Sequence, residues 1–240
     1  MPIFVNVMSK KEKASEFIEK AAQILDCILL GAFTLLAVGV LVKTFRLETR
    51  SLARIRFHYP LFVGFGAFFV TLVFPHLRRN IRWLMNFTHE FIHLVFALVF
   101  FRKIHRFNVD DSDCHVSFSS GPLGYMPITL SPYCFPLFTL ILLPWRFTTP
   151  ETNEYYLMVI DFLIGFSYAF HVCCWVTQTR LHQTDITGPG TVRSLLYITF
   201  FVILGFCIVI LTPASGVQNA LVRVFWEFPK GIITSLLSIF

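Results

Sequence analysis

The chain has 240 residues, of which 55% are hydrophobic and only 14% charged, and 29 of them are phenylalanine. Soluble globular domains carry about 25% charged residues, so this composition excludes an ordinary soluble enzyme and indicates an integral membrane protein. The net charge of +6 requires no nucleic-acid partner, because basic residues beside apolar spans favour anionic lipid headgroups.

The N-terminal segment does not resemble a cleavable signal peptide. Residues 10–20 carry charges of both signs, while Ala14, Phe17, Ile18 and Ala21 recur at helical spacing. We therefore predict that residues 1–22 form an amphipathic helix leading into the first membrane span.

Six long apolar runs follow along the chain. Each approaches the ~20 residues needed to cross a hydrocarbon core of ~30 Å, and a segment within lipid must be helical to satisfy its backbone. The sequence thus predicts one integral membrane domain over residues 1–240, an all-α polytopic fold with about six transmembrane helices. The predicted spans are 24–42, 59–75, 83–101, 123–145, 156–176 and 195–211.

Two features of this topology stay open in the sequence. The run 217–240 is interrupted by Pro229 and Gly231, which predicts either a short seventh span or an interfacial helix. Six spans place the loops 43–58, 102–121 and 177–194 on one face of the membrane. Because lysine and arginine are divided equally between the two faces, the positive-inside rule leaves the orientation open.

The third span contains the motif His89-Glu90-Phe91-Ile92-His93. On a helix, residues i and i+4 share one face, so both imidazoles can bind one zinc ion. Glu90 lies where it can act as the general base that takes a proton from water at the metal. Ionisable residues are costly in lipid, and three within five positions indicate a functional site.

Other interpretations of the motif also follow from its residue types. The three side chains could tie helices together through hydrogen bonds, or they could belong to a divalent-metal transporter or a non-catalytic metal-binding membrane protein. A transport path needs polar residues on several spans, and this chain has few. Outside the motif, the predicted spans contain only Asp26, Asp161 and His171 as acids or histidines.

Catalytic zinc usually has three protein ligands, so the motif requires a third from elsewhere. At 1.5 Å per residue, His93 and His171 lie about 12 Å and about 8 Å from the same face, whereas Asp161 lies near the opposite face. Asp185 follows the fifth span and can reach the metal only if the segment after Arg180 stays in a polar cavity or folds back. We expect both His171 and Asp185 to approach the metal and at least one of them to bind it, and the sequence leaves open which one is the third ligand.

Further motifs follow in a fixed order. A polar segment, 106–121, includes alternating residues at 115–119, and Gly121-Pro122-Leu123-Gly124 then opens a span containing Ser131-Pro132-Tyr133 and Pro136-Leu137. With the histidine motif, this order resembles the site-two protease family of intramembrane zinc metalloproteases, in a divergent bacterial branch. The resemblance covers about residues 80–190.

The resemblance implies a motif helix, a short β-hairpin, a second core helix and a third helix followed by a metal ligand. It further implies zinc-dependent hydrolysis of transmembrane protein substrates, in contact with membrane lipids and without nucleic acid, in the bacterial inner membrane. The Leu-Asp-Gly ligand motif of the family is absent here, and Asp185 is at the corresponding place.

The alternation at 115–119 predicts a half-exposed strand beside the site. Such a strand could bind an unwound substrate segment through main-chain hydrogen bonds, with little demand on substrate sequence. We therefore assign Val116, Ser117 and Phe118 as substrate-binding candidates, the alternative being an ordinary surface hairpin.

Overall fold

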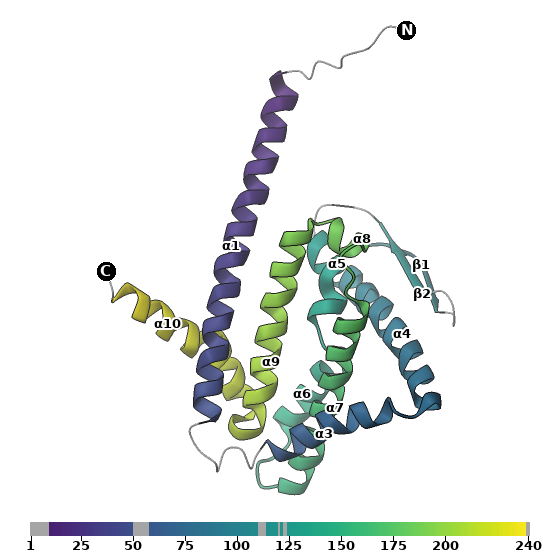
Figure 1. The fold of residues 1–240 in the computed structure, drawn as a ribbon, viewed down its shortest axis with the longest axis vertical. Coiled ribbons are helices and arrows are strands. Elements are labelled where there is room, and N and C mark those ends of the chain that lie inside the picture. Colours follow the sequence, from purple (N-terminus) through teal and green to yellow (C-terminus); the bar gives the residue numbers. More distant parts are fainter. Residues whose placement is uncertain (1–9, 50–57, 110–113, 120, 122–123, 239–240) are drawn as a thin grey trace.

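The computed structural model describes residues 10–49, 58–109, 114–119, 121 and 124–238 (Figure 1). In these residues the protein is mostly helical, with one small antiparallel sheet, in agreement with the predicted all-α class of fold. The elements are α1 (Lys10–Glu48), α3 (Tyr59–Thr71), α4 (Pro75–Val99), β1 (Ile104–Val109), β2 (Cys114–Phe118), α5 (Tyr125–Cys134), α6 (Leu137–Thr148), α7 (Glu154–Gln178), α8 (Thr184–Thr187), α9 (Thr191–Val222), η1 (Arg223–Glu227) and α10 (Phe228–Leu237).

Six separate spans are not confirmed. In the described part of the chain, 3 helices are individually long and apolar enough to cross a membrane, or up to 5 if each bent helix pair counts as one span. The α3–α4 pair is bent by 108° and the α5–α6 pair by 77°. With 13 residues, α3 is ~20 Å long and too short to cross alone. Pro75 and Pro136 stand at the two breaks, where proline begins a new helix more readily than it continues one.

The bent pairs change the expected placement of the loops. If α3 and α4 together make one crossing, the C-terminal end of α1 and the β-hairpin lie at opposite ends of the molecule, as Figure 1 shows. The sequence had predicted both on one face, because an apolar run reveals length and hydrophobicity but not direction. The connection between α7 and α9 lies at the same end as the hairpin.

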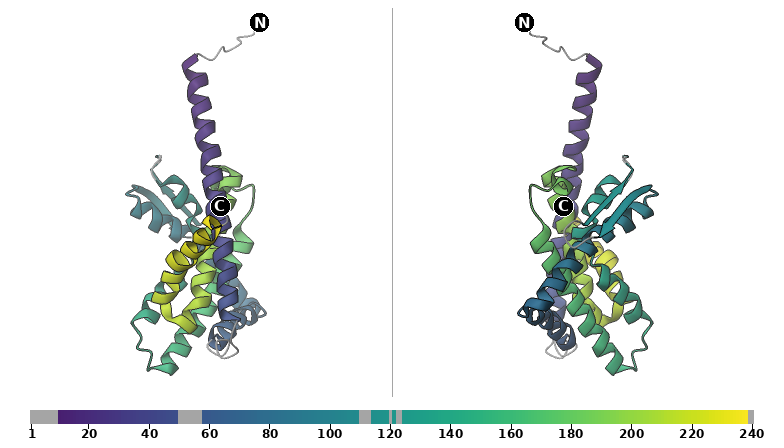
Figure 2. Two further views of the ribbon diagram at one scale, coloured as in Figure 1. Left: turned by 90° about the vertical axis from the view of Figure 1, so that its left-hand side faces the viewer. Right: turned by 90° about the vertical axis from the view of Figure 1, so that its right-hand side faces the viewer.

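The N-terminal helix is longer than predicted. From Lys10 onward, the expected amphipathic helix and first span form one continuous helix to Glu48, while residues 1–9 lie outside the described residues. Helix α1 runs beside α9, and Arg193 of α9 is paired with Asp26 of α1 at 2.6 Å. The N-terminal half of α1 extends beyond the rest of the molecule (Figure 2).

The C-terminal region is also helical, but it changes direction. Gly216 adopts a φ of 73°, a left-handed conformation that glycine tolerates, and interrupts α9. Segments η1 and α10 follow, and α10 returns to pack against α1, where Lys43 Nζ lies 3.4 Å from the carbonyl oxygen of Phe228.

Two glycines bring α3 and α7 into backbone contact. A Cβ atom on Gly64 would lie 1.9 Å from the carbonyl oxygen of Phe162, and one on Gly165 would lie 2.0 Å from that of Leu61. Neither position can hold a larger residue without separating the helices. Small residues of this kind allow close helix packing in membranes, where little hydrophobic force drives association.

The hairpin expected after the motif helix is present. Strands β1 and β2 pair in antiparallel register, with Phe107 opposite Val116. Ser119 donates its backbone N–H to the carbonyl oxygen of Lys103 at 2.9 Å. The N–H group of Ser119 therefore points toward β1. Because successive residues alternate, the N–H groups of Val116 and Phe118 face away from β1, along the outer edge of β2.

Candidate metal centre

Three predicted site residues meet at one point although they lie far apart in the chain. His89 and His93 come from one face of α4, and Asp185 comes from the one-turn helix α8. One ligand atom from each lies within 4.8 Å of the other two, so the group could hold a metal ion. Helix α8 is anchored to α9 by Ser194, whose hydroxyl donates to the carbonyl oxygen of Ile186 at 2.9 Å.

The separations of the ligand atoms suit tetrahedral coordination. The two Nε2 atoms are 3.3 Å apart, and each lies 3.6 Å from Asp185 Oδ2. Zinc bonds of ~2.0–2.1 Å at a tetrahedral angle require ligand atoms about 3.3 Å apart. Two imidazole nitrogens and one carboxylate oxygen are also a ligand set found in catalytic zinc sites, so the donor atoms fit zinc in both chemistry and spacing.

Neighbouring groups orient two of these ligands. His93 Nδ1 lies 2.8 Å from the carbonyl oxygen of Ile128, to which it can donate a hydrogen bond that leaves Nε2 free to bind a metal. The hydroxyl of Tyr133 lies 3.2 Å from Asp185 Oδ2 and 3.1 Å from Gln183 Oε1. The Tyr133 ring also contacts His89 edge to face, at a centroid distance of 5.2 Å.

The electrostatics of Asp185 agree with a cationic partner. Its partial burial raises the pKa of the carboxyl, but the imidazoles of His89 and His93, each 3.6 Å away, outweigh that effect and hold the pKa well below its usual range. The side chain is ionised at neutral pH and stays 28% exposed. An anionic oxygen is therefore presented to the two imidazoles.

Glu90 points toward the hairpin. Val116 donates its backbone N–H to Glu90 Oε2 at 3.0 Å, which uses a donor on the outer edge of β2. The side chain of Val116 is itself buried. Of the three substrate-binding candidates, Val116 thus lies directly at the site, and Ser117 and Phe118 continue the same strand.

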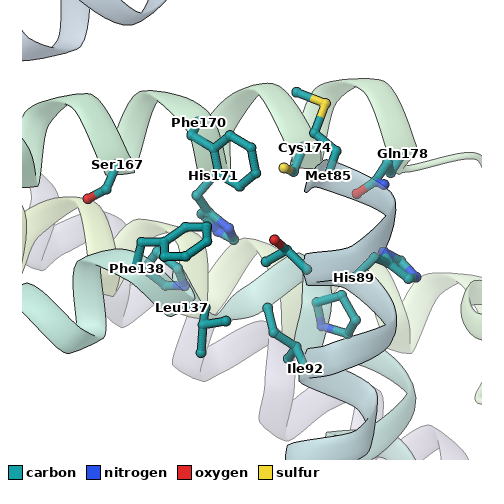
Figure 3. Close-up of a pocket in the computed structure, with 13 residues that line it drawn as sticks. Met85, His89, Ile92, Leu137, Phe138, Ser167, Phe170, His171, Cys174 and Gln178 are labelled. Atoms are coloured by element: carbon teal, nitrogen blue, oxygen red, sulfur yellow. The ribbon is translucent and has the colours of Figure 1, made fainter. Parts of the chain in front are cut away.

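His171 does not belong to the group of three. It is buried on α7 and points into a small cavity of about 10 Å³, which has room for about one water molecule (Figure 3). His89 lines the same cavity but points away from His171 (Figure 3). Asp161 lies nearer the start of α7 and pairs with Arg146 at 2.9 Å.

Sequence reasoning missed Tyr133 and Ile128. The prolines around Tyr133 were noted, but nothing in the sequence indicates that its hydroxyl reaches Asp185, 52 residues later. The Ile128 carbonyl oxygen is a backbone group, and its contact with His93 depends on how α5 packs against α4. A pattern within one segment cannot reveal either contact.

Comparisons with protein-family models, with curated proteins and with solved structures found no match to this chain. The features available to argue function are therefore those of the site and the membrane-type fold.

Proposed function

We propose that the protein is an intramembrane zinc metalloprotease that hydrolyses peptide bonds of membrane-embedded proteins. The observation that carries the proposal is the meeting of His89, His93 and Asp185 at tetrahedral spacing, with Glu90 on the same helix. The order of motifs along the chain supports the same assignment, as a divergent relative of the site-two proteases.

Each residue then has a defined task. His89, His93 and Asp185 would hold the ion, which when bound supplies Lewis acidity and a water whose pKa is lowered toward ~7. Glu90 accepts a proton from the attacking water and passes it to the leaving amine. Tyr133 holds the Asp185 carboxylate, and the Ile128 carbonyl oxygen fixes the tautomer of His93.

The outer edge of β2 is our proposed place for the substrate backbone. An extended peptide pairing there would accept hydrogen bonds from the N–H groups of Val116 and Phe118. The backbone N–H of Val116 already donates to Glu90, so the substrate backbone and the Glu90 carboxylate would compete for this one donor. Pairing would therefore release Glu90 from the hairpin as the scissile peptide arrives.

The experiment compares wild-type protein with Glu90→Gln in liposomes that hold a pool of single-span peptides. We expect the variant to keep its zinc, because the ligands remain, and to lose cleavage detectable by mass spectrometry. Glu227→Gln, which changes a carboxylate on η1, is the matched control and should cut normally. Unchanged cleavage by Glu90→Gln would refute the proposal. Zinc flux into the vesicles without proteolysis would favour the transporter instead.

A further inference from the structure

A second polar site lies at the end of the molecule opposite the metal centre. An open cavity of about 1050 Å³ is lined by residues of α3, α6, α7, α9, η1 and the connection from α6 to α7. It lies near the start of α7, whereas α8 follows the end of α7 (Figure 1). This volume is at the upper end of the range for small-molecule sites, and the residues of the proposed metal centre do not line it.

Aromatic residues beside the cavity indicate its depth in the membrane. Trp145, Tyr155 and Tyr156, at the connection from α6 to α7, are 52%, 75% and 57% exposed. Exposed tryptophan and tyrosine gather where lipid headgroups meet the hydrocarbon core. The cavity is therefore at the level of the headgroups.

The cavity contains a buried cation with unused donors. Arg146 and Asp161 are 6% and 4% exposed, and their ion pair joins Nε to Oδ1 at 2.9 Å. Among the described residues, no group bonds to the two terminal nitrogens of Arg146, whose guanidinium has five N–H donors in all. A guanidinium presented in this way matches two oxygens of a phosphate.

The remaining lining carries both signs of charge. Arg223 adds a second guanidinium, which donates to the Ser215 hydroxyl, while Glu151 and Glu154 add two exposed carboxylates. The walls include the apolar side chains of Leu157 and Met158. A ligand that fits this lining has a phosphate, an ammonium group a few bonds away, and an apolar part.

We propose that this cavity binds the headgroup of a zwitterionic phospholipid of the phosphatidylethanolamine type. The phosphate lies against Arg146 and Arg223, and the ammonium group lies between Glu151 and Glu154. The acyl chains leave the cavity along Leu157 and Met158. This site is independent of the proteolytic activity proposed above and uses none of its residues.

In the test, purified protein in detergent is titrated with short-chain phosphatidylethanolamine. The midpoint of thermal unfolding is measured at each lipid concentration. We expect saturable stabilisation of wild-type protein and at least about tenfold weaker binding by Arg223→Gln, which loses a charge-assisted contact. Arg193→Gln is the matched control, because both arginines are in ion pairs, Arg223 with Glu227 at 3.8 Å and Arg193 with Asp26, and both side chains are 25% exposed. It should bind the lipid as the wild type does.

Further variants and ligands test the contributions of the ammonium group, the phosphate and the acyl chains one by one. Glu151→Gln with Glu154→Gln should remove the preference for phosphatidylethanolamine over phosphatidylglycerol, which lacks the ammonium group. Arg146→Gln together with Asp161→Asn should abolish binding without leaving a lone buried charge.

Equal binding of both lipids by wild-type protein, or full binding by Arg223→Gln, would overturn the proposal. Glycerophosphoethanolamine binding as tightly as the lipid would also overturn it, because the acyl chains would then contribute nothing.

Discussion

The choice of third ligand rests on two side chains that the sequence could not rank. Asp185→Asn should lower zinc affinity by at least tenfold, because it removes the anionic oxygen 3.6 Å from both imidazoles. His171→Gln should leave zinc unchanged, since His171 is outside the group of three ligand side chains. Elemental analysis of purified protein during titration with a competing chelator measures both. Loss of zinc from His171→Gln alone would mean that the α7 histidine, not α8, supplies the ligand.

Tyr133 gives a second prediction at the scale of single residues. Tyr133→Phe should weaken zinc binding by ~10–100-fold, because removing the hydroxyl frees the Asp185 carboxylate from its orienting hydrogen bond. Cobalt(II) bound in place of zinc should report the altered ligand field through its visible absorption, which a change in folding alone would not produce. Tyr168→Phe is the control, because Tyr168 is also buried but lies on α7 outside the metal centre. Identical behaviour of the two variants would remove Tyr133 from the site.

At the scale of elements, the proposed role of the outer edge of β2 can be tested directly. Val116→Pro should sharply reduce cleavage with zinc content unchanged, because proline removes the N–H at the outer edge of β2. Phe107→Pro is the matched control. Phe107 stands opposite Val116, so its N–H faces the other edge of the hairpin, away from β2. Rates of peptide cleavage in liposomes compare the two, and an equal loss of cleavage would point to general damage of the hairpin instead.

The elements also show what the sequence could predict. Composition and apolar runs predicted membrane helices, and alternation at 115–119 predicted the strand, because both signals lie within one segment. The 108° and 77° bends were missed. In sequence, two short apolar helices joined at a bend cannot be distinguished from two separate spans, as at α3–α4, or from one continuous span, as at α5–α6. The motif indicated His89, Glu90 and His93 through helical spacing alone. The approach of Asp185 depends on α8 folding back, which is decided by tertiary contacts such as that of Ser194 with Ile186.

For the whole molecule, a bound metal would join α4 to the segment between α7 and α9. Any ligand that binds only the folded state stabilises it, by about 2.7 kcal/mol at a concentration of 100 Kd. Chelation should therefore lower the thermal midpoint of the wild type, and His93→Ala should be insensitive to chelator. Calorimetry or fluorescence in detergent gives both midpoints. A wild-type midpoint that ignores chelator and added zinc would argue against a metal joining these elements.

The position of α8 has a consequence for where a substrate would be cut. Asp185 lies in the connection between α7 and α9, and His93 is only six residues, or ~9 Å, from the end of α4 at Val99. If the proposed function holds, the hydrolysis would take place near one end of the spans and not at their middle. The last turn of any helix has carbonyl groups without an intrahelical partner, so opening it costs less than breaking the middle of a span. Substrates should accordingly be cut within about two turns of one end of their span, always the end on the hairpin side.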